Sequence, residues 1–206
     1  MSDRHLYKLI KLLVRLLSFL PKSFLLFVSD LLGLIWYHLD KRHRNVVLEN
    51  VRRSFPGQFS QGGLERFAKK NFKHIAGIAF EVVWSISWKP EDLHRHFIVR
   101  GDAHLKRAMA NGTGVVGLLC HMGNFEFLAS AIGLSGMNGH ALYRKLDFLP
   151  LEWLLKELRE RFGTRMVPLR KASKKIESLL REGKLIGTLL DQNVDWYKGV
   201  FVDFFG

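Results

Sequence analysis

One short segment carries the residues best suited to chemistry. The sequence "LLCHMGNFEFL" places His121 and Glu126 on the two sides of a Gly-Asn turn, beside Phe125 and Phe127. Two residues five apart on one continuous helix would point about 140° apart, so they meet only where a turn separates them. We therefore expect His121 at the end of a strand. Glu126 is expected in the first turn of the following helix, whose N-terminus favours an ionised carboxylate.

An imidazole and a carboxylate placed in this way can act as a general base. A carboxylate bonded to one ring nitrogen fixes the tautomer and makes the other nitrogen a better proton acceptor. This is the logic of a serine protease triad without its serine, so the hydroxyl of the substrate would be the nucleophile. The alternative is a structural histidine near a helix start with an exposed Glu126, and His-x4-Glu spacing also occurs by chance. The single cysteine, Cys120, lies among leucines and is expected to be a buried, inert thiol.

The elements that would position this pair follow an alternating pattern from residue 100 onward. Strands are expected in "GTGVVGLLC", "GHALYR", "TRMVPL" and "LIGTLLDQ". Helices are expected in "NFEFLASAIGL" (with Asn124 as N-cap), "LPLEWLLKELRERFG" and "ASKKIESLLREGK". This pattern predicts an α/β fold with a mainly parallel sheet flanked by helices. Ligands of such sheets collect at the carboxyl ends of the strands, where His121, Arg144 and Asp191-Gln192 are expected.

Three regions are expected along the chain: a hydrophobic N-terminal membrane anchor at 1–44, a helical region at 45–97 and the α/β part at 98–206. The first region opens with a basic amphipathic helix that Pro21 ends. The apolar run 24–37 that follows is shorter than the roughly 20 residues of a perpendicular span, and it contains Asp30. A single span and interfacial attachment therefore stay open, as does a pair of core helices. At the border between the helical region and the α/β part, "HFIVRG" predicts a short strand.

The charge of the chain favours an anionic partner. Its 206 residues carry a formal net charge of +13. The basic residues are spread over several predicted helices and match no recognised nucleic-acid module, so nucleic-acid binding is disfavoured. No Cys/His cluster has the spacing of a structural zinc site, and His94 and His96 are expected to be surface residues.

Three blocks of the sequence resemble one known family. The blocks "LLCHMGNFEFLA", "ALYRKLDFLPLEWLLKELRERFG" and "LIGTLLDQNVDWYKGVFVDFFG" are similar, in this order, to the bacterial lipid A biosynthesis acyltransferases, the late lauroyl/myristoyl transferases. The resemblance implies a glycerolipid-acyltransferase-like fold with a His-x4-Asp/Glu motif. It also implies an enzyme at the cytoplasmic face of the inner membrane, associated with its lipids. That enzyme would move a fatty acyl chain from acyl carrier protein (or coenzyme A) to a hydroxyl of an anionic glycolipid, with no metal and no cofactor.

The same resemblance assigns roles to particular residues. His121 matches the general base and Glu126 the acid that orients it. The positions implied to bind substrate or shape the site are Asn124, Arg144, Arg159, Arg161, Asp191 and Gln192. For Arg159 and Arg161, a solvated helix face is an equally good interpretation. The acceptor could also be another glycolipid, such as a mannosylated phosphoinositide, and a non-catalytic membrane-surface binding protein is the rival from a different class.

Two departures from the family pattern bear on these expectations. Asp203 stands where the last block of the family usually has proline. Family members also continue beyond this block with a C-terminal third that would complete the sheet. We therefore expect this chain to be a fragment, a truncated gene product or a shortened relative.

Overall fold

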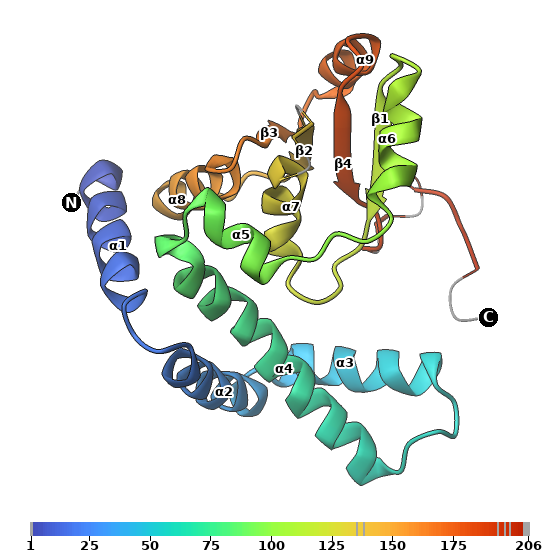
Figure 1. Ribbon diagram of the computed structural model, residues 1–206. Coiled ribbons are helices and arrows are strands. Elements are labelled where there is room, and N and C mark those ends of the chain that lie inside the picture. Colours follow the sequence, from blue (N-terminus) through green and yellow to red (C-terminus); the bar gives the residue numbers. More distant parts are fainter. Residues whose placement is uncertain are drawn as a thin grey trace. The chain divides into compact units, whose positions relative to one another are not determined.

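The computed structural model describes residues 2–134, 136–137, 139–192, 194–195, 197 and 199–203. The chain divides into two compact units (Figure 1). One comprises Met1–Ser18 with Ser85–Gln192, and the other comprises Phe19–Trp84 with Asn193–Gly206. Residues 201–203 are exposed. The three-region division expected from the sequence stays a prediction.

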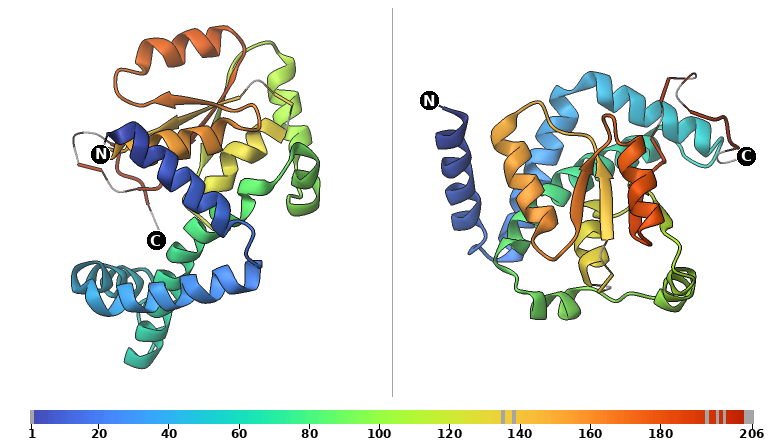
Figure 2. Two further views of the ribbon diagram at one scale, coloured as in Figure 1. Left: turned by 90° about the vertical axis from the view of Figure 1, so that its left-hand side faces the viewer. Right: turned by 90° about the horizontal axis from the view of Figure 1, so that it is seen from above.

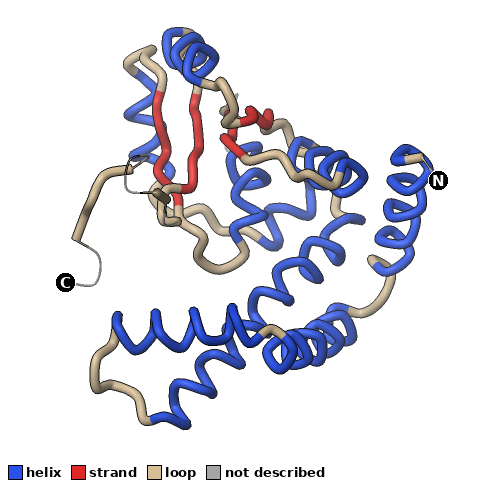
Figure 3. Tube along the Cα trace, turned by 180° about the vertical axis from the view of Figure 1, so that it is seen from behind, coloured by secondary structure: helices blue, strands red, loops and turns tan. Residues whose placement is uncertain are grey.

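The first unit contains a four-stranded parallel sheet (Figure 3). Its strands are β1 (Val115–Leu119), β2 (Gly139–Tyr143), β3 (Arg165–Pro168) and β4 (Leu185–Leu189), in the spatial order β1-β4-β2-β3. All three strand pairs are parallel, which confirms the predicted fold class. Because β4 lies between β1 and β2, the carboxyl ends of the first and the last strand are neighbours.

Helices cover the two faces of the sheet, as the turned view in Figure 2 shows. The helices that follow the first three strands are α7 (Leu128–Leu134, preceded by the 3-10 turn η2, Phe125–Phe127), α8 (Leu149–Glu160) and α9 (Ser173–Arg181). Side chains alternate between the faces along each strand. One face buries Ile186 and Val167 against Leu179 of α9. The other face buries Tyr143 and Met166 with Ala129 of α7.

Two elements before the sheet differ from expectation. The segment "HFIVRG" forms no strand: Phe97 ends helix α5 (Pro90–His96), and Ile98 is 84% exposed. Its β-branched residues favour a strand, but no neighbouring backbone pairs with it among the described residues. Helix α6 (Asp102–Ala110) was not predicted; it has no buried residue, so its sequence lacks a strong apolar stripe.

Helix α1 (Asp3–Leu17) belongs to the first unit and packs on α8. The Tyr7 ring meets the Trp153 ring edge to face, 5.9 Å between centroids. Glu157 accepts hydrogen bonds from Tyr7 and Lys11. The expected amphipathic helix is thus present, with Pro21 after its end. A row of leucines on α1 stays more than half exposed: Leu9, Leu12, Leu13 and Leu16.

The second unit is built on the packing of α2 (Lys22–Leu39) against α4 (Gln61–Trp84), with α3 (Lys41–Ser54) beside them. Every fourth residue of α2 is buried along one stripe: Leu25, Ser29, Gly33 and Tyr37. A Cβ on Gly33 would lie 2.6 Å from Lys73 Cα, so the close approach requires glycine there. Asp30 does not lie alone, because Lys73 Nζ is 2.9 Å from its carboxylate.

Among the described residues, α2 is the helix whose length and composition would allow it to cross a membrane. Its side away from α4 is apolar and exposed, with Phe24, Phe27, Leu31, Leu32 and Ile35.

Candidate active site

A histidine and an aspartate meet where β1 and β4 end. Leu119 is paired with Leu189 in the parallel ladder, so the residues two positions further on also lie side by side. The backbone N–H of His121 donates to Asp191 Oδ2 at 2.8 Å, and His121 Nδ1 is 2.7 Å from Asp191 Oδ1. The neighbouring strands therefore bring together two residues 70 positions apart in the sequence.

The contact with Asp191 fixes the tautomer of the His121 ring. Burial raises the pKa of Asp191, but the hydrogen bonds from the His121 ring and backbone outweigh it and hold the pKa below its ordinary value. An ionised carboxylate can only accept, so Nδ1 carries the proton that it shares with Asp191. In the neutral ring, Nε2 then has a lone pair and can take a proton from another molecule. The Phe125 ring packs on the imidazole, 4.7 Å between centroids.

Glu126 is engaged elsewhere. Arg159 Nε and Nη2 donate to its two carboxylate oxygens at 2.8 and 2.7 Å, a bidentate pair whose side chains are 19% (Arg159) and 16% (Glu126) exposed. Burial lowers the pKa of Arg159, but the bonds to Glu126 outweigh it and raise it. The expected hydrogen bond between Glu126 and His121 is therefore wrong. The Arg159 guanidinium binds both Glu126 oxygens, and Asp191, two residues after β4, supplies the carboxylate that contacts the imidazole. A catalytic role for Glu126 stays a prediction.

Arg161, which directly follows α8, binds the Ser85 backbone and side chain. Arg161 Nη1 and Nη2 donate to the carbonyl oxygen and hydroxyl of Ser85 at 2.7 and 2.8 Å. Burial lowers the pKa of Arg161 to about 10, which leaves it charged at neutral pH. Neither Arg159 nor Arg161 lies on a solvated helix face, because both side chains are partly buried and hydrogen-bonded. Their roles in substrate binding stay predictions.

The remaining predicted residues surround the carboxyl edge. Arg144 follows β2 directly and is exposed, and Gln192 is exposed beside Asp191. Asn124 stands at the N-cap position of η2 as predicted, but its side chain makes no capping hydrogen bond there. Their roles in binding stay predictions. Cys120 was expected to be buried and is exposed, because the chain leaves the edge strand β1 at this point.

One buried carboxylate was missed by the sequence analysis. Glu152 of α8 is 5% exposed and accepts hydrogen bonds from the Tyr143 hydroxyl at 2.7 Å and the Leu146 backbone N–H at 3.0 Å. Burial, followed by this bond, raises the pKa of Tyr143. Glu152 thereby fixes the loop that carries Arg144. A glutamate in the first turn of a helix is usually exposed, so the sequence offered no signal for it.

The described ranges contain no group of three or more His, Cys, Asp or Glu side chains that could hold a metal ion. His94 and His96 are both exposed, as expected, and the His96 ring also stacks on Trp88 with 4.1 Å between ring centroids.

Fold and geometry together define a parallel α/β protein with a histidine–carboxylate pair at the carboxyl edge of its sheet. Comparison with known proteins identifies the family: the chain belongs to the bacterial lipid A biosynthesis acyltransferases, whose family model matches residues 4–206. The resemblance seen in the sequence is thus confirmed.

Individual relatives are more distant. The chain is 25% identical over 191 residues to the lipid A biosynthesis acyltransferase of Haemophilus influenzae, covering 93% of this chain and 60% of the relative. It is 25% identical over 186 residues to the lipid A biosynthesis palmitoleoyltransferase of Escherichia coli, covering 90% of this chain and 60% of the relative. The lipid A biosynthesis acyltransferase of Shigella flexneri matches to the same extent. The chain therefore spans about 60% of the length of these relatives.

Proposed function

We propose that the protein is a membrane-associated O-acyltransferase that moves a fatty acyl chain from acyl carrier protein, or coenzyme A, to a hydroxyl of a lipid A precursor. The observation that carries this proposal is the His121–Asp191 pair at the carboxyl edge of the sheet. Membership of the lipid A acyltransferase family supports the choice of acyl group and acceptor.

In the proposed reaction His121 is the general base. Its Nε2 takes the proton from the acceptor hydroxyl as the oxygen attacks the thioester carbonyl. The tetrahedral intermediate then collapses, the carbon–sulfur bond breaks, and the thiolate receives the proton from the imidazolium. The products are an ester and a free thiol, and no metal or cofactor is needed. Asp191 holds the ring in the tautomer that this step requires, and it stabilises the imidazolium.

The two arginines Arg144 and Arg159 are proposed to have different roles at this edge. Arg144 is exposed at the end of β2, so its guanidinium is proposed to bind a headgroup phosphate or the oxyanion of the intermediate. Asn124 and Gln192 are proposed to shape the substrate site. Arg159 has both Glu126 oxygens as partners, and its proposed part is to fix η2 and thereby the position of Phe125 against the imidazole.

Membrane attachment is part of the proposal, and α1 supports it. Its exposed leucines lie next to a row of cations that includes Lys8 and Arg15, a pattern typical of helices that lie in the membrane interface. The cytoplasmic face of the inner membrane is proposed as the location. Flotation with anionic vesicles tests this: Leu12→Glu should weaken binding, whereas Ile98→Glu, an exposed position off the helix, should not. Equal binding of Leu12→Glu and the parent would contradict attachment through α1.

The transfer itself is tested with acyl carrier protein that bears a labelled acyl chain. The acceptor is a tetra-acylated, Kdo-bearing lipid A precursor in mixed micelles. The parent chain should form the labelled ester, and His121→Ala should lower the rate by about 10²- to 10⁴-fold, the usual contribution of a positioned base. His94→Ala, a surface histidine of the same unit, is the matched control and should keep the parental rate.

The same experiment separates the alternatives. A mannosylated phosphoinositide in place of the lipid A precursor tests the other glycolipid acceptor. Lipid binding by the parent without transfer to either acceptor would contradict the proposed function and favour a non-catalytic membrane-surface binding protein.

A further inference from the structure

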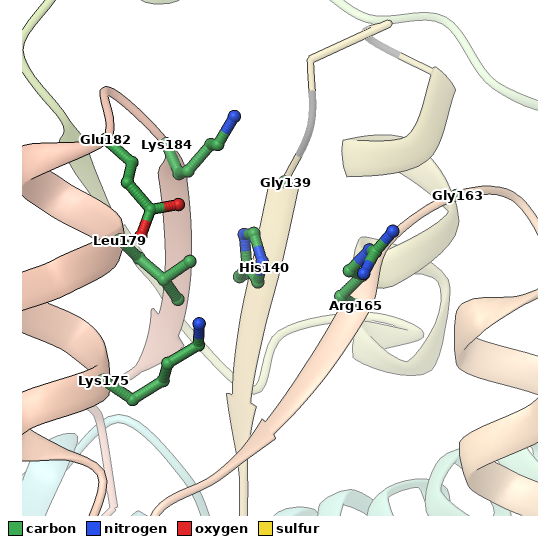
Figure 4. A pocket seen from close by; sticks show the side chains of 8 residues that line it. All are labelled: Gly139, His140, Gly163, Arg165, Lys175, Leu179, Glu182 and Lys184. Carbon is green, nitrogen blue, oxygen red and sulfur yellow. The ribbon is translucent and has the colours of Figure 1, made fainter.

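A cavity lies at the amino ends of the strands, at the opposite edge of the sheet from His121. Its volume is about 300 Å³, and it is formed by the amino ends of β2 and β3, the approach to β4 and one side of α9 (Figure 4). The strands are parallel and rise about 3.3 Å per residue, so five-residue strands separate this edge from the His121 edge by roughly 16 Å. The cavity is therefore not part of the site proposed for acyl transfer.

Positive charge dominates the lining of this cavity. Arg165, Lys175 and Lys184 line it together with a single carboxylate, Glu182. None of the three cations forms an ion pair with a described residue, and Glu182 accepts a hydrogen bond from Ser178 at 2.7 Å. The lining is thus left with an excess of positive charge, which favours occupation by an anion.

The floor of the cavity is a buried histidine. His140 of β2 is 8% exposed, and it is paired in the sheet with Arg165 of β3 and Ile186 of β4. Side chains of residues paired in this way share one face, so the imidazole lies between the arginine and the α9 side, where Figure 4 shows Lys175 and Lys184. A guanidinium fork and two ammonium groups around one hollow are donors that proteins use for phosphate oxygens.

We propose that this cavity binds the phosphoryl group of a phosphate monoester. Its volume is at the lower limit of ligand pockets, so it suits a phosphoryl group with a small attached moiety and not an extended polyanion. The phosphoryl group can come from a soluble phosphorylated compound or from the headgroup of a lipid such as phosphatidic acid. The proposal does not depend on acyl transfer, since the two sites lie at opposite edges of the sheet.

Calorimetric titration of the full chain in a zwitterionic detergent tests the proposal, with glycerol 3-phosphate and inorganic phosphate as probes. Saturable binding is expected. Lys175→Gln should weaken it about tenfold or more, because a charge-assisted hydrogen bond to the probe is lost. Lys174→Gln is the matched control: it removes the same charge from the neighbouring exposed position of α9, which does not line the cavity, and should leave the affinity unchanged.

The source of the phosphoryl group is distinguished by competition. Vesicles of phosphatidic acid in phosphatidylcholine should displace glycerol 3-phosphate if the lipid headgroup is the ligand, and phosphatidylcholine vesicles should not. Absence of displacement assigns the site to soluble phosphomonoesters. No saturable binding of either probe, or equal weakening by Lys174→Gln and Lys175→Gln, would overturn the proposal. Binding is measured without acyl donor, so loss of transfer in His121→Ala leaves this result unaffected.

Discussion

The ion pair between Glu126 and Arg159 permits a quantitative prediction about stability. Two single substitutions, Glu126→Leu and Arg159→Met, and the double variant define a double-mutant cycle. Each single substitution leaves one charge without its partner, whereas the double variant replaces both charges by apolar side chains of similar volume. The double variant should therefore lose much less free energy of unfolding than the sum of the losses in the two single variants.

The expected size follows from the burial and geometry of the pair. Both side chains are less than one-fifth exposed, and two hydrogen bonds of 2.7 and 2.8 Å join them. Removal of one partner from such a buried pair costs about 3–5 kcal/mol, while apolar replacement of both is often close to neutral. Allowing for the remaining exposure, we expect about 3 kcal/mol for each single variant and about 1 kcal/mol for the double variant. For a chain of this size, 1 kcal/mol corresponds to about 2–4 °C in Tm.

Urea unfolding of the full chain in mild detergent, followed by circular dichroism, measures these values. The pair Glu177–Arg181 on α9 is the matched control, because it has the same charges but its side chains are 62% and 79% exposed. Its cycle should show coupling close to zero. Single variants of Glu126 and Arg159 that cost less than about 1 kcal/mol, or whose effects simply add, would refute the conclusion that the Glu126 charge is engaged by Arg159.

Three further predictions concern other contacts. The pKa of Asp191 is lowered in the folded state, so its hydrogen bonds stabilise the protein at pH values above the pKa of an unfolded aspartate, about 3.9. That stabilisation is lost as the pH falls from there through the folded pKa. The free energy of unfolding, measured as a function of acid pH, should show this loss in the parent and not in Asp191→Asn. Glu152→Gln leaves one oxygen acceptor in place of two and should cost about 1–3 kcal/mol, with faster hydrogen exchange at the Leu146 amide; unchanged exchange would contradict its role in holding the loop. Gly33→Ala should destabilise the second unit by about 1–3 kcal/mol because its Cβ meets the α4 backbone. Gly77→Ala should be neutral or stabilising in thermal unfolding, because its Cβ would lie 3.9 Å from the nearest heavy atom, Ser29 Oγ. Equal effects of the two substitutions would be inconsistent with this packing.

The sequence predicts the elements of the sheet well because their signals are local. Each predicted strand from "GTGVVGLLC" to "LIGTLLDQ" is a short run dominated by apolar residues, and β1 to β4 confirm all four. The failed strand "HFIVRG" has the same local preference. A strand also needs a hydrogen-bonded neighbour, and whether one exists is decided by the rest of the fold. The exposure of Cys120 has a similar cause, since burial depends on what packs over the strand end.

The partner of His121 depends on strand order, which local patterns do not contain. The sequence places Asp191 at a carboxyl end, but only the order β1-β4-β2-β3 makes that end the neighbour of His121. Glu126 is near in sequence and was therefore the expected partner. Local proximity was outweighed by the guanidinium of Arg159, which offers two charge-assisted hydrogen bonds to the same carboxylate.

Strand order also makes the proposed base depend on the pairing of β4. Asp191 reaches His121 only when β4 has entered between β1 and β2. The contact between Asp191 and His121 requires β4 to pair with β1 from Val115–Leu185 to Leu119–Leu189. The imidazole therefore gains its orienting carboxylate at the same step that buries Ile186 in the sheet. A chain in which β4 is not paired therefore has the His-x4-Glu motif intact and yet lacks the oriented histidine, which is why the motif alone does not define the site.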